Sequence, residues 1–234
     1  MISPTYNFAA KKLSFCYSNS HLYNYCSNNP VKYVDPTGLT ITIPNVFEAI
    51  KNLYAIQKST RDAPMYQYEA GGNYNLSGKG KSWCNQSTFD VMIATGFNTT
   101  GVFESKGRYN TTANQAAINL EKLALDFENS GILEVSPKQA QLLANIGVTV
   151  VAAWNGGDQK GHMSTVMSEF MTDLKYSDDE GPILSNIGGK VGIMTTKDGF
   201  WRVKTDDGWK KSVKFYIDTN QFVIYDISDV LKEF

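Results

Sequence analysis

The hydrophobic period of the chain changes at residue 148, and this change restricts the possible folds more than any other feature. Before it, apolar residues recur every three or four positions, which predicts helices. After it, a continuous apolar run over 148–154 predicts a buried strand, and the following residues alternate between apolar and polar. Helices followed by a group of strands predict an α+β fold with a mostly antiparallel sheet.

Start and stop residues place the individual elements. The expected helices begin after the candidate cap Asn45, cover 84–95 up to Gly96, cover 112–128 with Phe127 on the inner face, and begin at Ser136-Pro137. In the second helix, Phe89, Met92 and Ile93 are expected to face inward. The expected strands are 148–154, 162–168, 182–187, and a hairpin of 213–218 with 221–226 around Thr219-Asn220.

Residues 1–39 differ from the rest of the chain. They are rich in Ser, Asn and Tyr, show no helical period, and end in the turn sequence Asp35-Pro36-Thr37-Gly38. The segment from Leu22 to Leu39, LYNYCSNNPVKYVDPTGL, resembles the C-terminal end of the Rhs (YD-repeat) core, which commonly ends in an Asn-Asn-Pro-Val…Asp-Pro-x-Gly-Leu sequence.

The Rhs resemblance implies a division into two parts. Residues 1–39 are then the remnant of the carrier core, and residues 40–234 are a variable toxin domain. It also implies cleavage after Leu39, with Asp35 near the cut, and a cognate immunity protein as a partner. The toxin is then secreted as part of a larger Rhs protein and delivered to a target cell, where the expected compartment is the periplasm.

Composition excludes several classes of protein. The chain has 22 basic and 23 acidic residues, and this balance does not suit a nucleic-acid binder that relies on a basic surface. No apolar run approaches the length of a membrane span, and the N-terminus lacks the pattern of a signal peptide. With 12% aromatic and 19% charged residues, wholesale disorder is also excluded.

Cysteine and histidine are scarce, which limits the possible chemistry. The chain has three cysteines and two histidines. Cys16, His21 and Cys26 match no common zinc spacing, so no metal or other cofactor is expected. Because these three residues fall in the expected carrier remnant, Cys84 and His162 are the only cysteine and histidine of residues 40–234.

The positions of these two residues favour nucleophilic catalysis. Cys84 follows a glycine-rich loop at the first turn of an expected helix, where the helix dipole favours a thiolate. His162 follows Gly161 at the start of a strand, and Asn186 on the next strand is a group that could orient the imidazole. A structural interpretation stays open for each residue: a small buried thiol, a structural histidine and a turn asparagine.

This order of residues resembles the papain-like cysteine amidohydrolases of the NlpC and CHAP type, which cleave peptide or amide bonds in peptidoglycan. Gly161-His162 followed by Val166 is similar to the Gly-His-x-x-x-Val strand of that family. The resemblance implies Cys84 as nucleophile, His162 as base and then acid, Asn186 as orienter, and a peptidoglycan stem peptide as substrate. Cys84 is followed by Asn85-Gln86-Ser87, whereas the family commonly carries an Asp-Cys-Ser-Gly block around the nucleophile.

Further candidates surround the nucleophile. The backbone N–H of Cys84 is a candidate oxyanion donor and Tyr74 a second one. Asn85 and Gln86 are candidate substrate contacts or helix-start residues. The tryptophans that could line a cleft are Trp83, Trp154 and Trp201.

Three alternatives remain at this point. The same cysteine chemistry serves a deamidase, transglutaminase or protease that acts on a cytosolic protein. A non-enzymatic binding module, with Cys84 and His162 in its core, is the second alternative. The third is a nuclease toxin, against which the two histidines and the absence of a convincing carboxylate cluster argue.

Overall fold

A computed structural model describes residues 46–63, 66, 83–103, 111–158, 160–203 and 208–221. These residues belong to one compact unit, Ile43–Phe222. The expected carrier remnant 1–39, its cleavage residues Asp35 and Leu39, and the oxyanion candidate Tyr74 lie outside the described residues.

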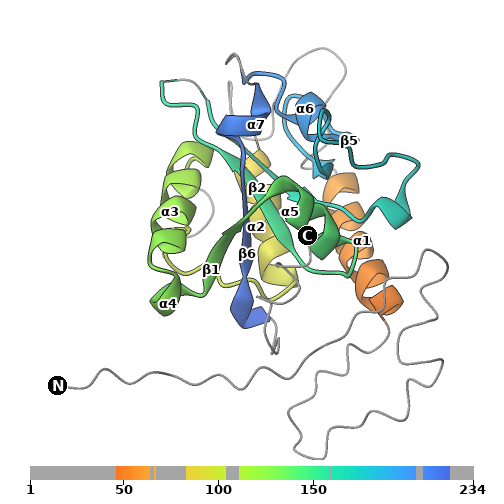
Figure 1. The fold of residues 1–234 in the computed structure, drawn as a ribbon, viewed down its shortest axis with the longest axis horizontal. Coiled ribbons are helices and arrows are strands. Elements are labelled where there is room, and N and C mark those ends of the chain that lie inside the picture. The colour runs from red at the N-terminus through yellow and green to blue at the C-terminus, as the bar shows by residue number, and fades with distance from the viewer. Residues whose placement is uncertain are drawn as a thin grey trace, which may run out of the picture. The chain divides into compact units, whose positions relative to one another are not determined.

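The described part is built around a six-stranded sheet (Figure 1). Its strands are β1 (Ile132–Val135), β2 (Val150–Trp154), β3 (His162–Val166), β4 (Ile183–Asn186), β5 (Gly192–Thr195) and β6 (Lys214–Asp218). They lie in the order β1-β6-β2-β3-β4-β5, and each neighbouring pair is antiparallel. The expected α+β class and antiparallel sheet are therefore confirmed.

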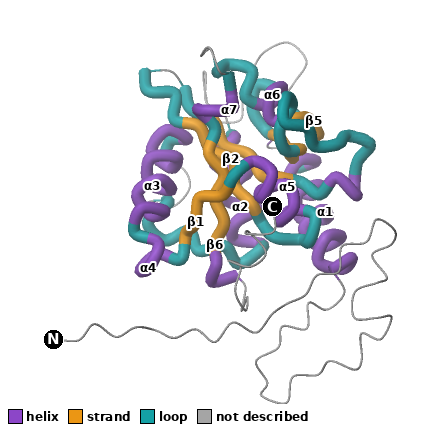
Figure 2. Tube along the Cα trace, in the orientation of Figure 1, coloured by secondary structure: helices purple, strands orange, loops and turns teal. Residues whose placement is uncertain are grey.

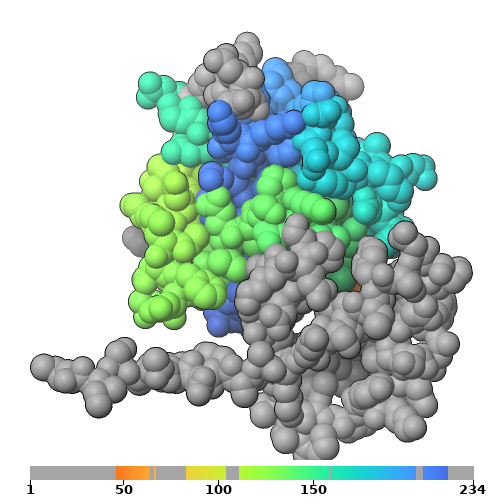
Figure 3. All heavy atoms as spheres, in the orientation of Figure 1, coloured from red at the N-terminus to blue at the C-terminus, as the bar shows by residue number. Residues whose placement is uncertain are grey.

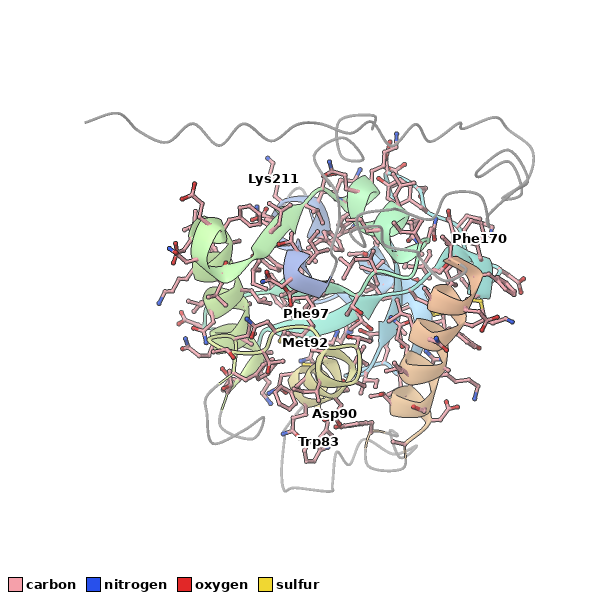
Figure 4. All side chains as sticks on the ribbon, turned by 90° about the horizontal axis from the view of Figure 1, so that it is seen from below. Trp83, Asp90, Met92, Phe97, Phe170 and Lys211 are labelled. Atoms are coloured by element: carbon pink, nitrogen blue, oxygen red, sulfur yellow. The ribbon has the colours of Figure 1, made fainter. Side chains whose placement is uncertain are left out.

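Helices pack on both faces of this sheet (Figure 2). The longer ones are α1 (Val46–Asp62), α2 (Cys84–Ala94), α3 (Ala113–Leu125) and α5 (Pro137–Ala144). The short ones are α4 (Phe127–Ser130), α6 (Thr196–Gly199), α7 (Trp209–Ser212) and the 3-10 turns η3 (Glu169–Met171) and η4 (Thr219–Gln221). In the view from below, α1 and α2 lie on one side of the strands, and α5 lies on the other (Figure 4).

An apolar cluster fills the space between α2, α3 and the sheet. Its fully buried members include Met92 and Leu120 from the helices and Val151, Met163 and Tyr216 from the strands. Figure 4 shows Met92 and Phe97 between α2 and the sheet, while Asp90 lies on the outer side of the helix. Cys84 belongs to the same cluster, so this packing places the start of α2 against the sheet.

The opposite face is covered by α5 and by the segment that follows β3. Ser136 and Gln139 form a reciprocal capping box at the start of α5, as the Ser-Pro sequence predicts. Asn145, just after this helix, donates a 2.9 Å hydrogen bond to Glu169 in η3. The space-filling view shows this segment, in cyan, beside the green of α5 (Figure 3).

Three expectations about local structure are wrong. The expected hairpin of 213–218 is wrong, because β6 lies between β1 and β2 and both of its edges are paired; residues 222–226 lie outside the described residues. Ile93 is 54% exposed, because the inner face of α2 runs through Val91 and Met92. The helix over 112–128 breaks at Asp126, which leaves Phe127 41% exposed in the separate turn α4.

Candidate functional site

Antiparallel pairing brings His162 and Asn186 to the same end of the sheet. His162 is the first residue of β3 and Asn186 is the last residue of β4. Because the two strands are antiparallel, the start of β3 lies beside the end of β4. The two side chains form a hydrogen bond of 2.7 Å between His162 Nε2 and Asn186 Oδ1. Asn186 is 1% exposed, so this contact is fixed within the protein.

The surroundings of Asn186 determine the proton arrangement on the imidazole. Asn186 Nδ2 donates a 2.7 Å hydrogen bond to the carbonyl of Lys190, which leaves Oδ1 as the atom that faces His162. Because an amide oxygen only accepts, Nε2 of His162 carries a proton and donates it. The ring nitrogen that remains for another partner is Nδ1.

Cys84 is the second side chain that interacts with the imidazole of His162. It is the first residue of α2, its side chain is 1% exposed, and it forms a hydrogen bond with His162. Helix α2 packs against β3, and the interaction of Cys84 with His162 brings the first residues of the two elements together. The first N–H groups of a helix have no intrahelical partner, and the resulting positive end favours a thiolate at Cys84.

The electrostatics of His162 reflect this arrangement. Burial of the ring is the largest effect and lowers its pKa, and the positive charge of Arg202 acts in the same direction. The negative charge of Cys84 and the hydrogen bonds to Cys84 and Asn186 raise the pKa. The net result is a raised pKa of His162, so the site favours an imidazolium beside a thiolate.

Close packing holds the imidazole in place. A Cβ atom added at Gly188 would lie 2.7 Å from His162 Cε1, so this position has no room for a side chain. The ring of Phe200 meets the imidazole edge to face with 4.8 Å between centroids. Together with Asn186, these contacts leave the ring few alternative orientations.

Two asparagines connect the start of α3 to both halves of the site. Asn85, next to Cys84, donates a 2.5 Å hydrogen bond from Nδ2 to the carbonyl of Thr111. Asn114 Oδ1 accepts from the N–H of Gly156, and Asn114 Nδ2 donates to the carbonyl of Gly157, both at 2.9 Å. These two glycines belong to the loop that leads to His162. The segment 111–114 therefore anchors both the start of α2 and the loop before His162.

The other expected site residues differ in their burial and in their contacts. Trp83 is 9% exposed and packs with Tyr66 and Ile187, so it forms part of a small buried cluster beside the site. Trp154 is buried and pairs with His162 across the sheet. Asn85 is engaged with the start of α3, as a helix-start residue would be. Gln86 is 6% exposed, and its Oε1 has no hydrogen-bond partner.

Sequence reasoning missed the contributions of Phe200, Asn114 and Thr111. Phe200 comes from a turn far along the chain from His162, and no local pattern connects the two. Asn114 and Thr111 flank the helix cap Thr112, where polar residues are ordinary, so their long-range hydrogen bonds carry no sequence signal.

No protein-family model matches the chain, and no curated protein matches it in sequence. Within the described residues, no group of three His, Cys, Asp or Glu side chains is placed to hold a metal ion. None of the helices in the described part of the chain is both long and apolar enough to cross a membrane.

Proposed function

We propose that the chain is a cysteine hydrolase with a papain-like arrangement, in which Cys84 is the nucleophile. The observation that carries the proposal is the continuous chain of contacts from Cys84 through His162 to Asn186. Each member has the partner that its role requires: the thiol has a base, and the base has a group that fixes its tautomer. A purely structural cysteine requires neither.

The proposed reaction is acyl transfer in two steps. The thiolate of Cys84 attacks an amide carbonyl carbon, and the N–H of Cys84 at the start of α2 is a candidate donor to the oxyanion. The carbon–nitrogen bond breaks, His162 gives its Nδ1 proton to the departing amine, and a thioester forms. His162 then removes a proton from water, which attacks the thioester and releases the acid and the Cys84 thiolate.

The proposed substrate is a peptide or amide bond in the stem peptide of peptidoglycan. This choice is supported by the resemblance of the Cys84 and His162 segments to the NlpC and CHAP type. The Rhs-like sequence up to Leu39 supports a toxin that is carried by an Rhs protein, separated after Leu39, delivered to the periplasm, and neutralised in the producing cell by an immunity protein.

Digestion of purified sacculi by the full chain tests this function. We expect mass spectrometry to show new muropeptides that are absent after treatment with a Cys84→Ala variant. Cys26→Ala, which removes a cysteine of the expected carrier remnant, is the matched control and should digest normally. Unchanged sacculi with the unaltered protein would contradict the proposal.

The site of toxicity separates a wall substrate from a cytosolic protein substrate. Expression with a periplasmic export signal should kill cells, whereas cytoplasmic expression should not. Killing from the cytoplasm alone, lost in Cys84→Ala, would instead identify a deamidase, transglutaminase or protease.

A further inference from the structure

The turn after α6 connects His162 to the protein surface. Phe200, the first residue after the helix, is 2% exposed and packs its ring against the imidazole of His162. The next two residues, Trp201 and Arg202, are exposed. A rigid contact with the catalytic base is therefore followed directly by two solvent-facing side chains.

The side chains of Trp201 and Arg202 contact one another. The guanidinium of Arg202 lies over the indole of Trp201, with its Cζ 5.0 Å from the ring centroid. Such a cation–π contact restricts a side chain that would otherwise sample many conformations. The indole is 49% exposed, whereas tryptophan side chains are on average largely buried.

Arg202 has a charge that no carboxylate balances within the described residues. The ion pairs between described side chains are formed by lysines. Asp198, on the same turn, faces Lys190 at 3.9 Å. The positive charge of Arg202 nevertheless extends to the imidazole of His162 and opposes its protonation. An anion held by Arg202 would thus lie within the electrostatic range of the site.

We propose that Trp201 and Arg202 form a subsite for a carboxylate group that the substrate carries close to its scissile amide bond. The planar guanidinium binds a carboxylate through two parallel hydrogen bonds, and the exposed indole packs against the adjoining part of the peptide. This inference rests on the proposed peptide hydrolase function and specifies the class of peptide: one with a free carboxylate near the cleaved bond.

Alkylation of Cys84 by two reagents tests the subsite without a natural substrate. Iodoacetate carries a carboxylate and iodoacetamide does not, while their reactive carbons are alike. In a full-length Cys16→Ser/Cys26→Ser background, we expect Arg202→Gln to lower the ratio of the iodoacetate rate to the iodoacetamide rate about threefold to fivefold. Arg202→Lys should keep most of the ratio, because it keeps the charge.

The matched control is Lys138→Gln. It removes one positive charge at an exposed position of α5, on the other face of the sheet, and should leave the ratio unchanged. A ratio that Arg202→Gln does not change, or that Lys138→Gln changes equally, overturns the subsite. A Cys84 that resists both reagents in the unaltered protein also overturns it, because such a site admits no substrate carboxylate.

Muropeptides supply the second measurement. We expect the unaltered protein to cleave peptides with a free carboxylate beside the scissile bond more efficiently than the same peptides with an amide there. Arg202→Gln should remove this preference through an increase in KM of about fivefold, with little change in kcat. Cleavage without any such preference overturns the subsite but leaves the hydrolase function intact. A normal alkylation response without cleavage of any muropeptide contradicts the wall function and leaves the carboxylate subsite supported.

Discussion

Replacement of Asn186 by alanine is the most direct test of the site. The substitution removes the acceptor of the 2.7 Å hydrogen bond from His162 Nε2. A hydrogen bond from a charged donor contributes about 1.5–3 kcal/mol. Because His162 is only partly buried, water can replace some of this interaction, and we take the lower end of the range. A loss of about 1.5 kcal/mol reduces the population of the thiolate–imidazolium pair about tenfold.

The rate at which iodoacetamide alkylates Cys84 at pH 6 measures this population. An ordinary thiol is only about 0.3% ionised at that pH, so a fast reaction reports the ion pair. The Cys16→Ser/Cys26→Ser background leaves Cys84 as the only thiol of the chain. We expect Asn186→Ala to react about tenfold more slowly than the protein with Asn186 intact.

Asn186→Asp is the matched variant, because its carboxylate accepts the same hydrogen bond and favours the imidazolium. It should retain the fast reaction at pH 6. Thermal unfolding of each variant shows whether the fold is intact, which matters because Asn186 is 1% exposed. Equal alkylation rates in the parent protein and in the Asn186→Ala variant, both folded, would refute the role of Asn186 as orienter. A slow reaction of Cys84 in all three proteins would favour a core cysteine instead.

Four further predictions concern the same site. Gly188→Ala should greatly slow the alkylation of Cys84, since the new Cβ would lie 2.7 Å from His162 Cε1 and displace the ring; alkylation at the original rate would contradict this. Gln86→Met should raise the free energy of unfolding by about 1 kcal/mol in a urea titration, because it removes a buried oxygen without a partner, and a loss of stability would show that Gln86 is satisfied. The pKa of His162 in the folded protein is raised above 6.5, the ordinary value for histidine, so the folded state binds this proton more tightly than the unfolded chain does. The resulting stabilisation is complete below pH 6.5 and is lost as the pH rises through the raised pKa. Cys84→Ala should lower the titration midpoint of His162 in NMR spectra, because burial then opposes only the bond to Asn186.

The elements that sequence reasoning predicted well are those with strong local signals. The Ser136-Pro137 sequence sets the start of α5 through a capping box, whatever the helix later packs against. The apolar run that contains β2 requires burial on both faces, and the structure provides it, with helices on either side of the sheet.

Strand partners and exposed faces depend on distant parts of the chain. β6 pairs with β1, whose residues lie about 80 positions earlier, and the four-residue length of β1 gives too short an alternation to recognise between two helices. The exposure of Ile93 likewise follows from where the sheet contacts α2, which the helical period of α2 alone does not determine.

In the candidate site, too, one part follows from local sequence signals and the other depends on long-range packing. His162 and Asn186 lie on consecutive strands that pair with one another, so a correct assignment of the two strands already brings their ends together. The position of Cys84 depends on how α2 packs, and no ladder of hydrogen bonds sets that distance. It depends on apolar contacts and on the link from Asn85 to Thr111. The geometry between Cys84 and His162 is therefore the part of the candidate site most sensitive to substitutions outside it, and the start of α3 is where such substitutions should act.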